Sequence, residues 1–231
     1  MKKNEVAELI KNTLNIESDK NAQEDLNESL VAQTKTYALS TEALSQANKK
    51  NHYELYEQYV KDFNRISAEL DSVSRTGANS NHSLFRSLKI DETYNLNAVY
   101  LHELYFANIG DLQSEITMDT LSFMRLERDF GSFDDWQRDF LACATASRCG
   151  WAMTGYNVYT QTYMNYVIDL HSLQVPVGVI PVIVMDVWQH AYYKDYLKNV
   201  SEYTQNMMRE LNWNVIESRF KRTEKVAQAL K

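Results

Sequence analysis

The sequence predicts an α+β fold: a long N-terminal α-hairpin domain followed by a C-terminal α/β domain with a three-stranded antiparallel sheet. Two observations predict it. The first half of the chain contains no proline, and Gly77 is the only glycine before Gly110, so little there interrupts a helix. The second half contains runs rich in Tyr, Val, Thr, Ile and Met, which are typical of strands. These runs cover residues 150–160, 162–170 and 179–187.

The chain begins with an expected helical extension. Residues 2–15 place apolar side chains at helical spacing. The acidic and polar residues 20–38 also favour a helix, although they differ in composition from the residues after them. We therefore assign residues 1–36 to a helical N-terminal extension.

A helical hairpin domain, residues 37–115, is expected next. Ser40 or Thr41 is its predicted first N-cap, and Gly110 is its predicted end signal. Between them the segment rich in Ser, Asn and Gly indicates a turn. The expected parts are a helix over residues 41–70, a turn over 72–81 and a helix over 83–108.

The C-terminal α/β domain is assigned to residues 116–231. Gly131 and Ser132 introduce a predicted helix over residues 133–147. The strand-like runs follow this helix, and helices are expected again from about residue 190 to the end.

Composition and charge exclude several classes of function. The chain has 24 basic and 31 acidic residues, a formal net charge of -7, which argues against a nucleic-acid partner because phosphate binding requires a basic face. The longest apolar run, residues 175–185, contains Pro176 and Pro181 and is too short to span a bilayer. The N-terminus lacks the apolar region of a secretory signal. With Cys143 and Cys149 as reduced, packed thiols, we expect a cytoplasmic protein with no membrane partner.

Asp186 and His190 are the clearest local candidates for a metal site. They lie four residues apart, where an apolar strand is expected to end and a helix to begin, so their side chains can converge on one point. A carboxylate and an imidazole together suit an ion such as iron or manganese. The spacing is common by chance, so the pair alone does not decide for a metal.

The residues around this pair carry a longer motif. Residues 186–193 read DVWQHAYY, which differs only at Gln189 from D-x-W-E-H-A-Y-Y. Further motifs are Ile180-Pro181, FGSF at 130–133, GWA at 150–152, NW at 212–213 and RF at 219–220. Together these motifs resemble those of the iron/manganese superoxide dismutases, over roughly residues 36–222. The resemblance implies the fold predicted above, and dismutation of superoxide anion at one iron or manganese ion per subunit.

The resemblance also implies two histidine ligands on the helices of the N-terminal half. His82 opens HSLF, as in the family motif N-H-S-L-F-W, but it lies in the expected hairpin turn, where a side chain would be exposed. His102 fits the family better in its helix position and in the residues that follow it, HELYFANI. His52 is the candidate on the first long helix. The implied metal ligands are therefore His52, His102, Asp186 and His190.

Tyr59 and Tyr56 are the implied proton relays at the mouth of this site. In the family, the helix continues H-x-x-x-H-x-x-x-Y-V, whereas Tyr59 lies seven residues after His52, one fewer than in that pattern. Positions i, i+4 and i+7 of a helix share a face, so His52, Tyr56 and Tyr59 can all face the site. A local π-bulge, or its absence, can absorb the difference. Leu55 or Tyr56 replaces the second histidine of the family pattern.

Two other positions depart from the family pattern. Gln189 replaces the glutamate that reaches a metal ligand of the partner subunit, so we expect a homodimer with a weaker bridge. Ala98, four residues before His102, cannot supply the glutamine that binds metal-bound solvent in the family. His171, in the loop before the metal-binding strand, is the candidate that replaces it; a solvent-facing histidine is the alternative.

The implied reaction cycles a metal between its trivalent and divalent states, while Trp151 and Trp188 wall the cavity and keep it dry. Two alternatives stay open. One is a redox-inactive metal-binding homologue of the same fold, motivated by Gln189 and the missing helix histidine. The other is a helical interaction protein, motivated by the acidic N-terminal extension. A di-iron bundle is disfavoured because no E-x-x-H pair occurs.

Overall fold

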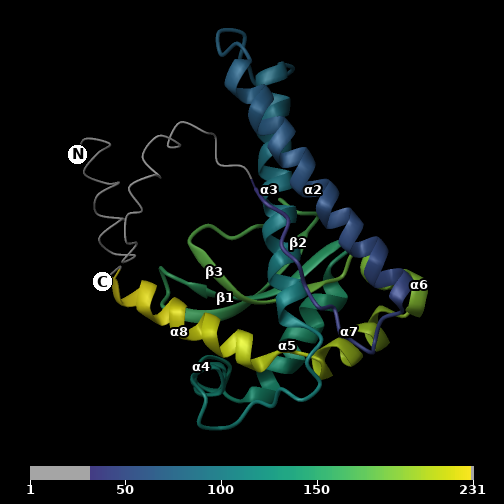
Figure 1. Ribbon diagram of the computed structural model, residues 1–231. Coiled ribbons are helices and arrows are strands. Elements are labelled where there is room, and N and C mark those ends of the chain that lie inside the picture. Colours follow the sequence, from purple (N-terminus) through teal and green to yellow (C-terminus); the bar gives the residue numbers. More distant parts are fainter. Residues whose placement is uncertain (1–31, 230–231) are drawn as a thin grey trace, which may run out of the picture. The chain divides into compact units, whose positions relative to one another are not determined.

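Residues 32–229 are the part of the chain that the computed structural model describes (Figure 1). The predicted helix over residues 2–15, and most of the predicted helical extension over residues 1–36, lie outside the described residues. The helix predicted to run to residue 38 is wrong for residues 32–38, which are not helical.

The segment after residue 31 binds to a neighbouring helix, α2 (Gln46–Ser72), and not to itself. The Ala32 amide donates to Asn64 Oδ1 at 2.8 Å, and the Asn64 side chain donates back to the Ala32 carbonyl at 2.8 Å. The Lys35 amide donates to the Tyr56 hydroxyl at 3.0 Å. Because these side chains occupy the backbone groups that a helix would pair, the segment lies along α2 without helical bonds.

The predicted hairpin is formed by α2 and α3 (Leu84–Asn108), which lie side by side in Figure 1. The predicted N-cap of its first helix is wrong: Ser45 caps α2, and its side chain accepts a hydrogen bond from the Asn48 amide. The Glu210 carboxylate accepts from the amides of Glu42 and Ala43, which holds the preceding backbone out of the helix. A distant carboxylate therefore delays the start of α2.

The predicted three-stranded antiparallel sheet is confirmed, with the strand order β2-β1-β3. The helix predicted after Ser132 is also present as α5 (Phe133–Ala146), capped by the Ser132 side chain. One helix, α4 (Leu121–Phe130), is not predicted by the patterns above; Thr120 caps it and Leu126 is fully buried beneath it. The strands are β1 (Gly150–Asn157), β2 (Thr162–Asp169) and β3 (Val179–Asp186).

Helices follow the sheet, as expected, in the described part of the chain. They are α6 (Gln189–Tyr196), α7 (Val200–Arg209) and α8 (Trp213–Ala229). Helix α8, yellow in Figure 1, packs against α3, α4 and β3. The fold is thus the α+β class that the sequence predicts.

Gly150 fixes the end of β3 relative to β1. A Cβ atom on Gly150 would collide with the Ile168 carbonyl oxygen of the other neighbouring strand, β2, so only glycine fits at this position of β1. The Gly150 carbonyl accepts from the Val187 amide at 2.9 Å, and the next residue, Trp151, pairs with Asp186 in the sheet register. This contact places the Asp186 carboxylate at the edge of the sheet beside Trp151.

Arg219 ties α8 to the end of α3 and to β3. Its guanidinium donates to the Leu104 carbonyl, the Asn108 side chain and the Val182 carbonyl. Asn108 in turn donates to the Val184 carbonyl at 2.9 Å. One hydrophobic core runs through the hairpin and the sheet, and these bonds hold α3 across β3. The division into domains at residues 37–115 and 116–231 stays a prediction.

Candidate metal centre

Four side chains from four elements converge where the hairpin meets the end of β3. His52 lies on α2, His102 on α3, Asp186 ends β3, and His190 is in the first turn of α6. One possible ligand atom from each lies within 4.8 Å of the others. From Asp186 Oδ2, the Nε2 atoms of His52, His190 and His102 lie at 3.1, 3.2 and 3.6 Å. Two ligands that share one ion through bonds of about 2.1 Å stand about 3–4 Å apart, so these separations suit a single ion.

The tautomer of His102 leaves a lone pair in the centre of this cluster. His102 Nδ1 lies 2.7 Å from the Ala98 carbonyl, which can only accept, so Nδ1 carries the proton. Nε2 is then an acceptor, and among the described residues it has no hydrogen-bond partner although it is fully buried. A buried polar atom without a partner costs about 1–3 kcal/mol. A metal ion at this point would satisfy it.

Burial keeps the two hairpin histidines neutral. Burial is the main cause that lowers the pKa of both His52 and His102, and neighbouring imidazoles lower it further. Burial opposes ionisation of Asp186, but the His190 and His52 side chains outweigh it and hold the pKa of the Asp186 carboxyl well below its usual range. The Trp188 amide also donates to Asp186 Oδ1 at 2.8 Å. The Asp186 carboxylate is thus buried beside the two neutral hairpin imidazoles, and a bound cation would balance its negative charge.

The donor set fits iron or manganese. Three imidazole nitrogens and one carboxylate oxygen are ligands that these ions accept, whereas a thiolate-rich set would favour zinc or copper. His52 is 2% exposed and packs edge-on against Phe106, and His102 packs edge-on against Trp151, so the rings have little freedom to turn away. The residues present therefore fit the metal that the resemblance implies.

His171 lies beside this cluster and is completely buried. The expectation of a solvent-facing side chain at this position is therefore excluded. The Trp151 indole donates to His171 Nδ1 at 3.1 Å, and His171 Nε2 lies 3.1 Å from the Tyr59 hydroxyl. Because the indole can only donate, His171 accepts at Nδ1 and carries its proton on Nε2, from which it donates to Tyr59. Burial lowers the pKa of His171 to about 4, so the ring is neutral at physiological pH.

Tyr56 and Tyr59 point to different partners although they lie three residues apart on α2. Tyr56 is fully buried, donates to Glu103 Oε1 at 3.0 Å and accepts from the Lys35 amide; burial is the main cause that raises its pKa to about 12. Tyr59 instead meets His171, and its ring centroid lies 5.4 Å from that of His102. Helix α2 contains no π-bulge, so the i+7 spacing alone turns Tyr59 toward the cluster.

The remaining predicted site residues occupy three different environments. Trp151 is fully buried behind His102, with ring centroids 5.0 Å apart. Trp188 is partly buried and stacks on His190, with ring centroids 5.6 Å apart. His82 is exposed in the loop at the hairpin tip. The structure therefore brings the predicted residues together, apart from Tyr56, which faces Glu103, and His82, which the sequence already sets aside.

Comparisons with known proteins point to one family. The model of the C-terminal domain of iron/manganese superoxide dismutases matches residues 120–219. The superoxide dismutase (Mn) of Mycolicibacterium fortuitum is 26% identical over 79% of this chain and 87% of that protein. The superoxide dismutase (Fe) of Aquifex aeolicus is 34% identical, over 82% of this chain and 90% of that protein. This chain belongs to the iron/manganese superoxide dismutase family.

Around α6, this iron/manganese superoxide dismutase family member presents exposed side chains next to a buried polar atom. Gln189 is exposed at the first position of the helix, and Tyr193 is 51% exposed. The Trp188 indole nitrogen is buried and has no acceptor among residues 32–229. This part of the surface therefore combines an exposed aromatic side chain with an unsatisfied donor.

Two residues beside the site in this superoxide dismutase family member are missed by the sequence analysis. Tyr94 packs edge-on against His171, with ring centroids 4.7 Å apart, and the Asn97 side chain donates to the His171 carbonyl at 2.8 Å. Tyr94 lies eight residues before His102 on α3, a spacing that places both on one face and could have placed Tyr94 near the site, whereas the spacing of Asn97 gives no such signal. In the described residues no helix is long and apolar enough to cross a membrane.

Proposed function

We propose that this protein is a superoxide dismutase, which converts superoxide to dioxygen and hydrogen peroxide at one iron or manganese ion per subunit. The proposed metal ligands are His52, His102, Asp186 and His190. The observation that carries the proposal is the buried His102 Nε2 atom, which faces Asp186 Oδ2 at 3.6 Å and has no hydrogen-bond partner within the described residues. Relatives named for each metal support both ions as candidates.

An iron or manganese ion bound here would supply one-electron chemistry by alternating between a trivalent and a divalent state. Two superoxide anions and two protons then give one dioxygen and one hydrogen peroxide. Asp186 offsets part of the positive charge of such an ion, and His52 and His102 present lone pairs because burial keeps them unprotonated. Trp151, which is fully buried against His102, keeps water from this side of the cavity.

Tyr59 is the proposed proton donor at the mouth of the site, and His171 is the residue that orients it. Burial raises the pKa of the Tyr59 hydroxyl, so the hydroxyl retains its proton at neutral pH. The His171 Nε2–H bond occupies one lone pair of the Tyr59 oxygen. Tyr56 is not proposed for this role, because its proton is committed to Glu103.

Metal analysis and a dismutation assay on the same samples test the proposal. The full chain is loaded with iron or with manganese, and superoxide decay is followed by pulse radiolysis. We expect about one ion per chain and turnover with at least one metal. Asp186→Ala should lose both, while Asp134→Ala, which removes an exposed carboxylate of α5, should lose neither. Full metal content in Asp186→Ala would contradict the proposed ligand set.

A redox-inactive metal-binding protein is the second candidate. It is favoured by Gln189, which stands where the family pattern has a glutamate, and by Leu55 or Tyr56, one of which replaces the second histidine of that pattern. The pKa values and hydrogen bonds of such neighbours set the reduction potential of a bound metal. One ion per chain with no superoxide decay above the metal-free control, for iron and for manganese alike, would support this candidate against the first.

We also propose a homodimer that uses the surface around α6. Support comes from the half-exposed Tyr193, the exposed Gln189 and the buried Trp188 indole without an acceptor in the described part of the chain. Sedimentation equilibrium should give twice the chain mass, and Tyr193→Glu should weaken association. A wild-type chain that sediments as a monomer at micromolar concentration would contradict this proposal.

A cytoplasmic location without nucleic-acid or membrane partners completes the proposed function. The net charge of -7 supports the absence of a nucleic-acid partner. Cys143 and Cys149 are free thiols, which supports a reducing compartment. Cell fractionation with an antibody against the chain tests the location, and recovery in the membrane pellet would contradict it.

A further inference from the structure

A hollow of about 370 Å³ is lined by side chains from α3, α8, the start of β3 and the segment that precedes α2. This volume falls within the range of roughly 300–1,000 Å³ that is typical of small-molecule sites. Neither the proposed metal ligands nor the residues proposed to serve the reaction line it. The hollow is therefore a place apart from the candidate metal centre, and the proposed function makes no use of it.

Arg219 supplies a buried positive charge to the lining of this hollow. Its side chain lines the hollow, although the residue is only 7% exposed. Its three hydrogen-bond acceptors are the Leu104 carbonyl, the Val182 carbonyl and the Asn108 side chain, and none of them is charged. Within residues 32–229, no carboxylate forms an ion pair with it. A buried guanidinium without an acidic partner is costly, and an anion in the hollow would supply that partner.

The Arg219 guanidinium also retains donors for such an anion. Arginine carries five N–H groups. Both N–H groups of Nη1 and one of Nη2 are used in the bonds described above, so the Nε–H group and one Nη2–H group have no acceptor in the described part of the chain. Elsewhere in this chain the same two nitrogens bind a carboxylate: Arg125 donates from Nε and Nη2 to Glu224 at 2.7 and 3.3 Å. A carboxylate group matches this pair of donors.

Arg222 adds a second positive charge to the same hollow. It lies three residues after Arg219 on α8, so the two side chains share a face of that helix, and it is exposed. Lys35 and Glu103 also line the hollow, but they form an ion pair at 2.5 Å and offset each other. Among the described residues of the lining, the two arginines therefore leave an excess of positive charge, although the net charge of the chain is -7.

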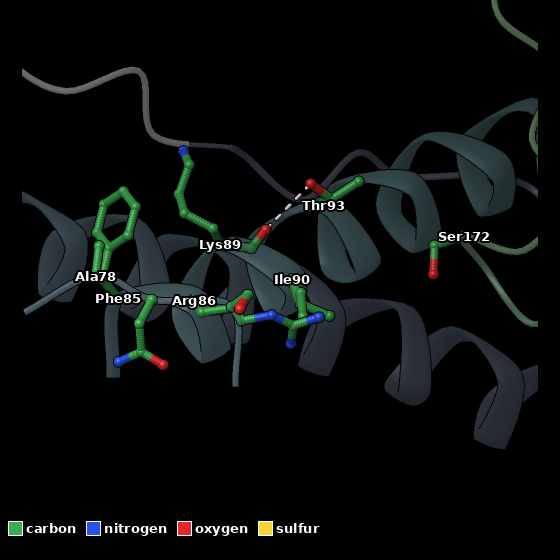
Figure 2. A pocket seen from close by; sticks show the side chains of 9 residues that line it. Ala78, Phe85, Arg86, Lys89, Ile90, Thr93 and Ser172 are labelled. Atoms are coloured by element: carbon green, nitrogen blue, oxygen red, sulfur yellow. Dashed lines mark hydrogen bonds between the residues drawn. The ribbon is translucent and has the colours of Figure 1, made fainter. Parts of the chain in front are cut away.

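The larger hollow of about 680 Å³ along α3 lacks this combination (Figure 2). Among the described residues, the charged side chains that line it are Arg86 and Lys89, and both are exposed. Lys89 is also paired with Glu92. The larger hollow thus offers no buried charge to an anion, so size alone does not distinguish the two.

We propose that the hollow at Arg219 binds a small organic carboxylate. The carboxylate group accepts hydrogen bonds from Arg219 Nε and Nη2, and the exposed Arg222 attracts it from the open side. The apolar body of the ligand packs against Leu104, Ile180 and Val226, which also line the hollow. An apolar wall beside a few placed polar donors is the usual composition of a small-molecule site.

Titration calorimetry of the metal-loaded full chain with 4-bromobenzoate tests the proposal. We expect saturable binding of one molecule per chain in the hollow. The amide 4-bromobenzamide has nearly the same shape but no charge, and it should bind about tenfold more weakly because charge-assisted hydrogen bonds are the stronger ones. Equal affinity for the acid and the amide would overturn the proposal, because the arginines would then contribute nothing.

Two substitutions of exposed arginines give a matched comparison. Arg222→Gln removes the charge at the open side of the proposed site, and we expect it to weaken 4-bromobenzoate binding about two- to fivefold, the size of an exposed charge pair. Arg86→Gln removes the same charge beside the hollow of Figure 2 and should leave binding unchanged. Equal affinities of Arg222→Gln and Arg86→Gln would contradict the proposed site.

The bromine atom locates the bound molecule directly. In crystals grown with 4-bromobenzoate, its anomalous diffraction signal should lie in the hollow, with the carboxylate group at Arg219. A bromine signal only at the metal centre, or only at contacts between molecules in the crystal, would overturn the proposal. This readout needs no variant of Arg219, whose bonds to α3 and β3 support the fold. It also needs no superoxide turnover, so it stands apart from the test of the proposed dismutase function.

Discussion

The base and the tip of the α2–α3 hairpin carry similar sequence signals but differ in burial. At the tip, His82 begins a motif that resembles a metal-ligand motif, yet its side chain is exposed and its amide binds the Asn79 side chain. At the base, His102 has 0% exposure and lies in the core shared by the hairpin and the sheet. The local motif is therefore a weaker guide than position along the helix, because only the base excludes water from a histidine.

The largest difference between the two ends should be in metal content. His102→Ala removes the lone pair that faces Asp186 and leaves three of the four proposed ligands, so bound iron or manganese should fall from about one per chain to near zero. Metal analysis after exhaustive dialysis measures this. Retention of a full ion by His102→Ala would show that the cluster does not bind metal as proposed.

The stability of the protein should also depend on Arg219, at the base of the hairpin. Arg219→Met leaves the acceptors on Leu104, Val182 and Asn108 without a buried donor, at about 1–3 kcal/mol for each buried group that finds no other partner. We expect a loss of about 3–5 kcal/mol in the free energy of unfolding, measured by urea denaturation. Arg222→Met, one turn further at an exposed position, should change it by less than about 0.5 kcal/mol.

The sequence predicts the regular parts of this molecule well, and the reason is local. The hairpin helices and the three strands follow from patterns within each segment, with few glycines or prolines to interrupt them. The start of α2 does not, because Glu210, far away in the sequence, binds the amides of Glu42 and Ala43 and shifts the cap to Ser45. Helix α4 is missed because its only fully buried apolar side chain, Leu126, gives too weak a pattern over ten residues.

In the candidate site, too, some residues could be predicted from the sequence and others could not. The residues that would bind the metal follow from motifs, so their convergence could be anticipated. The roles of Tyr56 and Tyr59 could not be separated, because both fit a helical face and only the positions of Glu103 and His171 distinguish them. The sequence does not predict Tyr94 as a site residue for a related reason. A tyrosine on a helix does not indicate a site by itself, and Tyr94 lies beside the site only because the loop with His171 packs against it.

Apolar packing at the tip should matter for the tip alone. Leu88 is 7% exposed in a small cluster with Ile66 and Leu70, separate from the main core. Leu88→Ala should cost about 2 kcal/mol, at the low end for a buried leucine, because few neighbours lose contacts. Metal content should stay at the wild-type level. A fall in metal content without global unfolding would show that the tip and the base are coupled.

Low pH should destabilise the protein through His171, at the base of the hairpin. Its folded pKa is about 4, mainly because of burial, against an ordinary value of 6.5. Between these values the unfolded chain binds a proton that the folded chain does not, so stability is complete above pH 6.5 and is lost as pH falls toward 4. For metal-free protein, we expect wild type to lose about 2 kcal/mol more than His171→Gln over this interval. Urea denaturation at both ends of the interval measures it, and equal losses would contradict the buried neutral ring.

His82→Gln should have the smallest effect of all and completes the comparison. The loop is held by backbone bonds to the Asn79 side chain, which the substitution leaves in place, and the His82 side chain lies in solvent. We expect unchanged metal content and a change in the free energy of unfolding within about 0.5 kcal/mol. Loss of metal in His82→Gln would mean that the tip supplies a ligand. In that case burial at the base would no longer explain which histidine binds.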